Sequence, residues 1–252
     1  MALECDGGQN DALVARPKLF ALFTFLVAHG SSRFHQRDTL LAVFWPESDE
    51  DRARNNLRQS LHQLRRVLDD RVIIRRGRTQ VGVDGARVDC DVLAFQAALN
   101  EGCVADALAI YHGDFLEGFH AKDAPAFDDW VDRERVRLRS LAGDAARTIA
   151  EKAEEEGRFD DAIREWNRVR VLEPFDERAL KRLLWNLMKA GKRAEALMQY
   201  RRFVRQRAEL GLTPSAEIAS LMRSEFPVHA SHPTRPSATR SGSLRVHDRI
   251  AT

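Results

Sequence analysis

The sequence has few cysteines and no long apolar run, and these two absences argue against a disulfide-stabilised fold and against a membrane-spanning helix. Its three cysteines, Cys5, Cys90 and Cys103, are odd in number and widely spaced, so they predict reduced thiols without a disulfide framework or a paired metal site. The most apolar stretch, Leu19 to Ala28, has ten residues and is too short to cross a membrane. The N-terminus lacks a basic-then-apolar signal peptide, and the cytoplasm is the expected compartment.

Motifs that commonly carry catalysis are missing as well. No G-x-x-x-x-G-K-[ST] phosphate loop occurs, since Gly191-Lys192 is followed by Arg193, and there is no G-x-S-x-G elbow, H-E-x-x-H helix or C-x-x-C pair. His29 and His35 flank a predicted turn. They would either ligate a metal or be surface histidines, and the lack of a nearby cysteine or suitably spaced carboxylate favours the second. The sequence therefore predicts no enzyme, no catalytic residue, no cofactor and no metal.

What the chain does have is an uneven charge. Its 252 residues and 44% hydrophobic content predict one or two domains with real cores. The net charge is only +2, yet residues 16–87 hold 14 Lys/Arg against 8 Asp/Glu, whereas residues 88–156 hold 7 against 16. A basic module followed by an acidic one is expected when only the first meets nucleic acid.

The basic module begins with three predicted helices. Their ranges are 17–29, 37–45 and 49–68. Pro17 suits the first turn of the first helix, Pro46 ends the second, and Ser48 is the expected N-cap of the third. The third helix is the longest.

This third helix has two different faces. Ala53 and four leucines at helical spacing form a stripe for a core: Leu57, Leu61, Leu64 and Leu68. The opposite face mixes arginine with amides: Arg52, Asn55, Gln59, His62, Gln63 and Arg66. Such side chains can hydrogen-bond base edges in a major groove, and an exposed polar helix is the alternative for an isolated stretch.

Residues 71–83 predict a hairpin with a basic tip. Two β-branched runs surround a turn at Gly77. The hairpin carries four arginines and no acidic residue: Arg71, Arg75, Arg76 and Arg78. By themselves these arginines fit either phosphate and minor-groove contact or protection of an edge strand. Because these arginines directly follow the third helix, they favour DNA contact. Three helices, the third the longest, followed by a hairpin are the order of a winged helix-turn-helix.

The second half of the chain reads as helical and internally repeated. Gly157–Ala162 aligns with Gly191–Ala196 at an offset of 34 residues, which is the period of tetratricopeptide repeats. The same offset pairs Trp166 with Tyr200, so that a small alanine lets two helices approach and an aromatic ring fills the space beside it. Residues 102–111 repeat this pattern once more, out of phase.

An aromatic-rich segment interrupts these repeats between residues 111 and 141. We expect four of its side chains to pin a loop onto the first repeat: Phe115, Phe119, Phe127 and Trp130. A bound cofactor is the less favoured explanation of these rings.

The predicted fold class is mainly α, in two domains and a tail. A winged helix-turn-helix domain with a β-hairpin wing covers 12–87, and an all-α TPR-like domain covers 88–226. Residues 227–252, rich in Pro, Ser, Thr and Arg, predict a disordered basic tail. This tail would either add weak attraction to DNA or be simply solvated.

Two parts of the sequence resemble a known family. FWPESDEDRARNNLRQSLHQLRRVL with the hairpin IIRRGRTQVGV resembles the OmpR-like winged-helix domain of SARP-type bacterial transcriptional activators. YHGDFLEGF, FDDWVDRERVRLR and the repeats up to about Glu225 are similar to the bacterial transcriptional activation domain that follows it in that family. The resemblance covers roughly residues 12–226, and its YxGDFLEGF and W-P-x-S-D-E pieces are fairly specific.

The resemblance implies a promoter-binding activator. Its third helix would enter the major groove of repeated operator elements, its wing would touch the neighbouring minor groove, and its helical domain would support dimerisation and contact with RNA polymerase. Double-stranded DNA and RNA polymerase are then the partners, with a homodimer on DNA, no membrane and a nucleoid-associated location. The implied DNA-contacting residues are Arg52, Asn55, Asn56, Gln59, His62, Gln63, Arg66, Arg75, Arg76 and Arg78.

One departure and one alternative accompany this interpretation. Family members usually begin with a small β-sheet, but only about fifteen residues precede Arg16, so we expect that sheet to be shortened or missing. The alternative function is a TPR-type protein–protein adaptor without specific DNA binding. The wing arginines argue against it, because an adaptor has no use for them.

Overall fold

The computed structural model describes residues 3–5, 13–29 and 34–225, and the predicted tail over 227–252 lies outside them. Residues up to Leu212 belong to one compact unit, and α11 belongs to a second. The helices are α2 (Pro17–Ala28), α3 (Arg37–Phe44), α4 (Glu50–Val67), α5 (Asp91–Asn100), α6 (Val104–Ile110), α7 (Pro125–Glu155), α8 (Phe159–Leu172), α9 (Glu177–Lys189), α10 (Arg193–Glu209) and α11 (Ala216–Glu225). The strands are β1 (Leu3–Cys5), β2 (His35–Gln36), β3 (Ile73–Arg76), β4 (Gln80–Val83) and β5 (Val88–Cys90).

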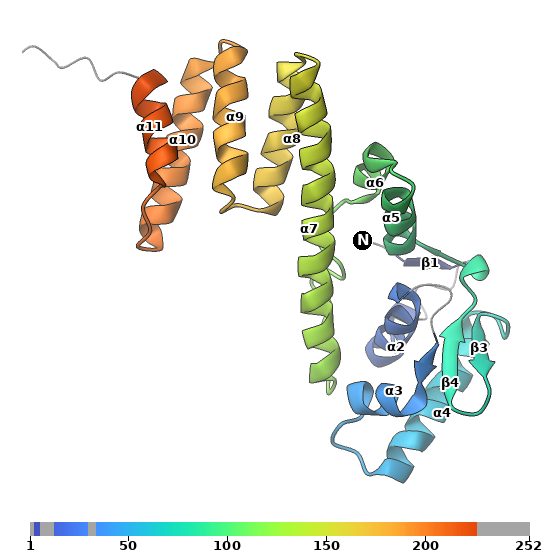
Figure 1. Cartoon of the computed structure of the whole chain (residues 1–252). Helices are drawn as coiled ribbons and strands as arrows, with labels where there is room; N and C mark the ends of the chain where they lie inside the picture. The colour runs from blue at the N-terminus through green and yellow to red at the C-terminus, as the bar shows by residue number, and fades with distance from the viewer. Residues whose placement is uncertain (1–2, 6–12, 30–33, 226–252) are drawn as a thin grey trace, which may run out of the picture. The chain divides into compact units, whose positions relative to one another are not determined.

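The first part is a winged helix-turn-helix, as predicted. Helices α2, α3 and α4 lie close to their predicted bounds, and β3 and β4 form the hairpin wing, whose turn holds Gly77 at φ +65°. Strand β2 pairs with the other edge of β4, which gives the order β2-β4-β3 (Figure 1). The predicted cap of α4 is wrong, because Asp49 occupies the N-cap and its carboxylate accepts a hydrogen bond from the Arg52 amide at 2.9 Å.

The described residues include an N-terminal sheet of two strands. Strand β1 pairs antiparallel with β5 in a two-stranded ladder that sets Leu3 opposite Cys90 and Cys5 opposite Val88. Strand β5 leads directly into α5, so this ladder lies where the winged-helix part continues into the helical part.

The helical part has the predicted repeat. Gly157 and Gly191, 34 residues apart, both end a helix in the left-handed region, at φ +72° and +75°. The amide that follows each glycine donates to a carbonyl five residues earlier, from Arg158 to Ala153 and from Lys192 to Leu187, at 2.8 Å in both turns. The same hydrogen bonding recurs after Gly102. Trp166 is fully buried, at 0% exposure. Its predicted counterpart Tyr200 is only half-buried, and Phe203, three residues later on α10, is buried instead, at 1% exposure.

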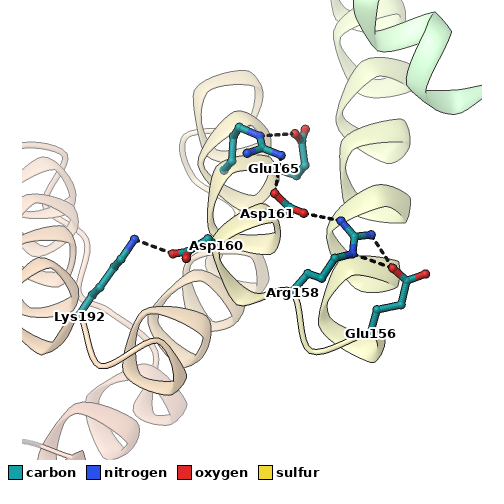
Figure 2. Close-up of polar contacts among 7 residues, drawn as sticks. Glu156, Arg158, Asp160, Asp161, Glu165 and Lys192 are labelled. Carbon is teal, nitrogen blue, oxygen red and sulfur yellow. Dashed lines mark hydrogen bonds and ion pairs between the residues drawn. The ribbon is translucent and has the colours of Figure 1, made fainter.

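Exposed ion pairs connect the turns of the repeats. Arg158 lies between Glu156 and Asp161, and Lys192, one repeat later, donates to Asp160 at 2.7 Å (Figure 2). All of these contacts are on the surface, where water and salt screen an ion pair. These ion pairs therefore contribute little to stability, and the buried rings and alanines supply most of it.

The aromatic segment packs against a different partner from the predicted one. Phe119 contacts Phe20 of α2, Trp130 contacts Phe25 of α2, and the ring centroids are 5.1 and 4.8 Å apart. Phe127 lies 5.5 Å from Phe44 of α3. The prediction that these rings pin a loop onto the first repeat is wrong for these three, because they pack on aromatic side chains that α2 and α3 present.

The loop of the YHGDFLEGF motif is held by arginines from α7 and α8. Arg135 donates to the carbonyl of Phe115 at 2.8 Å, and Arg139 forms an ion pair with Asp114. Arg168 donates to the carbonyl of Leu108, at the end of α6. These bonds satisfy backbone carbonyls that no strand or helix would otherwise pair.

Candidate nucleic-acid interface

Helix α4 presents one face because its other face is buried. Ala53, Leu57, Leu61 and Leu64 are at most 3% exposed, and the helix lies beside β3 of the wing (Figure 1). The amphipathic stripe thus fixes how α4 is rotated about its axis.

The structure leaves nearly all predicted DNA-contacting side chains accessible. Asn56 is half-buried and the other nine are exposed: Arg52, Asn55, Gln59, His62, Gln63, Arg66, Arg75, Arg76 and Arg78. By helical spacing Asn55, His62 and Arg66 lie opposite the buried stripe, with Arg52 and Gln59 beside them. These five form the outer ridge of α4.

One flank of this ridge borders a depression next to the start of α2. Asn56, Gln59 and Gln63 of α4 line it together with Arg16 and Lys18. Lys18 is held there by a 3.2 Å hydrogen bond to the Asp123 carbonyl and by the ring of Trp45, 5.4 Å away. Amides that can read bases therefore lie beside cations that can attract phosphates.

The other flank forms a basic cluster from three elements. Arg37 of α3, Arg54 and Arg58 of α4, and Arg75 and Arg78 of the wing line one pocket, in which Asp38 is the only acidic residue among the described lining. The Arg37 amide donates to the Thr79 carbonyl at 2.8 Å, so the start of α3 is tied to the tip of the wing.

Two arginines in and beside this basic cluster have lowered pKa values, partly because of neighbouring positive charges. Burial, followed by the charges of Arg75 and Arg58, lowers the pKa of Arg37. Burial, followed by the charge of Arg75, also lowers the pKa of the neighbouring Arg65. Guanidinium groups stay charged despite such shifts. A polyanion that approached them would offset this repulsion with an opposite charge.

Sequence reasoning missed Arg37, Arg54 and Arg58. Arg54 and Arg58 lie four residues apart on one side of α4, which was a readable signal. Arg37 gave no such signal, because only the packing of α3 against the wing brings it near Arg75.

Arg71 differs from the other wing arginines. Its guanidinium donates to both carboxylate oxygens of Asp69, at 3.1 and 2.9 Å, and this pairing holds the pKa of Asp69 well below its usual range. Arg71 thus already has an ionic partner, and its role in DNA contact stays a prediction. Arg76 lies over the ring of Phe34 at 5.7 Å and forms no ion pair with a described carboxylate.

Of the two predicted surface histidines, His35 is buried instead and His29 is half-buried. His35 is 8% exposed and packs on Phe25 and His29, and His29 stacks on Trp130 with ring centroids 5.2 Å apart. Within the described part of the chain no three His, Cys, Asp or Glu side chains gather as metal ligands would. In the same part, none of the helices combines the length and apolarity of a membrane span.

Comparisons with known proteins agree with this architecture. The bacterial transcriptional activator domain family matches residues 87–224. No curated protein matches the chain. A solved structure of Mycobacterium tuberculosis EmbR in complex with a low affinity phosphopeptide is similar, with a TM-score of 0.53 and 20% identity, over 81% of this chain and 57% of that chain. At this identity the likeness shows the fold alone, and the chain spans little more than half of that structure. The family match covers more than half of the sequence, so the chain belongs to the bacterial transcriptional activator domain family.

Proposed function

We propose that the chain is a sequence-specific DNA-binding transcriptional activator that reads repeated operator elements. Helix α4 would enter the major groove and the β3–β4 wing would contact the adjacent backbone and minor groove. The observation that carries the proposal is the outer ridge of α4, where Asn55, Gln59 and Arg66 are exposed above a buried leucine stripe.

The ridge supplies the chemistry of base reading. Arginine pairs with two acceptors of guanine, and asparagine or glutamine pairs with adenine, at about 1–3 kcal/mol of discrimination for each good contact. Asn55 already accepts a hydrogen bond from Arg58 at 3.0 Å, which orients its amide. Arg66 has no ion pair among the described residues and is available to a base.

The basic cluster supplies sequence-independent affinity. Arg37, Arg58 and Arg75 come from α3, α4 and the wing and would neutralise phosphates along one side of the inserted helix. Phosphate contacts of this kind set the register of a protein on the duplex.

Variants of base-reading residues and variants of phosphate-contacting residues should differ in how they change DNA binding. We expect Gln59→Ala and Arg66→Ala to reduce discrimination between operator and random DNA by about 1–3 kcal/mol. Arg76→Ala should weaken binding to every sequence and lower the salt slope by about 1. Gel shifts over a series of salt concentrations measure both effects, on an operator obtained by selecting bound genomic fragments.

Arg71→Ala is the matched control on the same hairpin. It removes the same side chain as Arg76→Ala, but its guanidinium is already engaged by Asp69, so binding should change little. If Gln59→Ala, Arg66→Ala and Arg76→Ala all bound like the parent chain, DNA recognition through this surface would be wrong.

Dimerisation and RNA polymerase contact are further parts of the proposal and rest on the family resemblance. Two operator repeats should bind two chains with positive cooperativity, whereas a single repeat should bind one. Sedimentation of the chain with one-repeat and two-repeat duplexes distinguishes these outcomes, and independent binding to two repeats would rule out the dimer.

A further inference from the structure

A second pocket lies in the helical part, away from α4 and the wing. Its volume is about 300 Å³, and α8, α10 and the turn after α8 line it. Its lining residues are Asn167, Arg170, Val171, Pro174, Gln199, Arg202 and Gln206. Two guanidiniums and three amides thus share one cavity, and no carboxylate is among them.

Arg170 is the unusual member of this lining. Its Nη1 donates to the Gln199 amide oxygen at 3.0 Å, but its Nε is buried and has no hydrogen-bond partner among the described residues. Its guanidinium lies over the ring of Phe203 at 5.9 Å. Burial, followed by the charge of Arg202, lowers the pKa of Arg170, so its charged form lacks a compensating partner.

Nearby arginines show that such partners are usual in this part of the fold. Arg147 is paired with Glu173 and Asp176, and Arg207 is paired with Glu177 at 2.9 Å. A buried donor without an acceptor lowers stability, and a half-buried cation is stabilised by an opposite charge. Arg170 and Arg202 therefore form a site that lacks an anion.

We propose that this pocket binds an acidic peptide segment of a partner protein, with carboxylates at Arg170 and Arg202 and an apolar side chain beside Val171 and Pro174. Val171 is 78% exposed and Phe175, directly after Pro174, is 56% exposed. An apolar border of this kind suits a peptide side chain better than a bare phosphate. The three amides can pair with the peptide backbone, which presents both donors and acceptors.

Fluorescence anisotropy with a defined probe tests the proposal. The probe is a fluorescein-labelled peptide in which two glutamates flank a leucine between glycines and serines, and its comparison peptide has glutamine at both glutamate positions. We expect the full chain to bind the acidic peptide at least about tenfold more tightly, because only its carboxylates can form charge-assisted hydrogen bonds with Arg170 and Arg202.

A substitution in the protein, Arg202→Glu, complements the comparison of the two peptides. Arg202 is exposed, so the variant should fold like the parent chain, and it should weaken peptide binding at least about tenfold. Arg201→Glu, the adjacent exposed arginine that does not line the pocket, makes the same charge change and should leave binding within about twofold. Arg170→Gln should also weaken binding, with its unfolding midpoint measured in parallel.

Three results would overturn the proposal. The first is equal loss in Arg202→Glu and Arg201→Glu, and the second is equal binding of the two peptides. The third is an Arg202→Glu variant that loses DNA binding but keeps the peptide, because the pocket would then take a nucleic acid. We expect Arg202→Glu to leave DNA binding unchanged. A failure of the peptide proposal can therefore be distinguished from a failure of the proposed α4 interface with DNA.

Discussion

At the residue scale, one buried carboxylate connects three helices. Glu154 of α7 is 8% exposed and accepts hydrogen bonds from Trp166 of α8, at 2.6 Å, and from the Asn186 amide of α9. It also forms an ion pair with Arg182. A charge in this position is tolerated because its partners satisfy it.

We expect Glu154→Ala to lower the free energy of unfolding by about 3–5 kcal/mol, because it leaves buried donors and a cation without their acceptor. Urea unfolding followed by circular dichroism measures the loss. Glu155→Ala, the exposed neighbour, should change stability by less than about 0.5 kcal/mol. Similar losses in both variants would show that the buried network contributes nothing specific.

At the element scale, the start of α4 depends on a single side chain. Asp49 caps the Arg52 amide, so Asp49→Ala should destabilise the chain by about 1 kcal/mol. Ser48→Ala is the matched control and should be close to neutral, because the Ser48 hydroxyl does not cap the helix. Equal effects of the two substitutions in chemical unfolding would contradict this placement of the cap.

The turns of the repeats make a second prediction at this scale. Gly157 and Gly191 lie at positive φ with nothing within 4 Å of an added Cβ, so an alanine meets backbone strain but no clash. Each alanine substitution should cost about 1–2 kcal/mol, and the two costs should agree because the turns share one geometry. Thermal unfolding of the two variants measures them, and a neutral result at either site would contradict the shared turn.

At the scale of the whole molecule, an aromatic cluster couples the winged-helix part to the helical part. Trp130 of α7 contacts Phe25 and His29 of α2, and Phe127 contacts Phe44 of α3. Large buried rings dominate the stability of such contacts. The winged helix is therefore expected to unfold together with α7.

Trp130→Ala should uncouple these parts. We expect a loss of about 3–5 kcal/mol and two separate transitions in calorimetry in place of one. Val136→Ala, on the same helix but 66% exposed, should keep a single transition. A single transition in Trp130→Ala with unchanged enthalpy would show that the cluster does not couple them.

The order of elements followed from the sequence by itself. Helix bounds, the Leu57–Leu64 stripe and the 34-residue repeat depend on contacts between residues three or four apart and on glycine at turns, and such contacts are readable along the chain. The α4 cap was misplaced by one residue, because Ser48 and Asp49 are both good caps and backbone geometry selects between them.

Tertiary structure decided which charged and aromatic groups meet. Arg37, Arg58 and Arg75 come together only because α3, α4 and the wing pack on each other, and Arg170 meets Arg202 only across the stacked repeats. The partner of Trp130 was likewise decided by the faces that α2 and α3 left uncovered. Local pattern specifies what each element presents, whereas the pairing of distant groups depends on how the buried faces fit together.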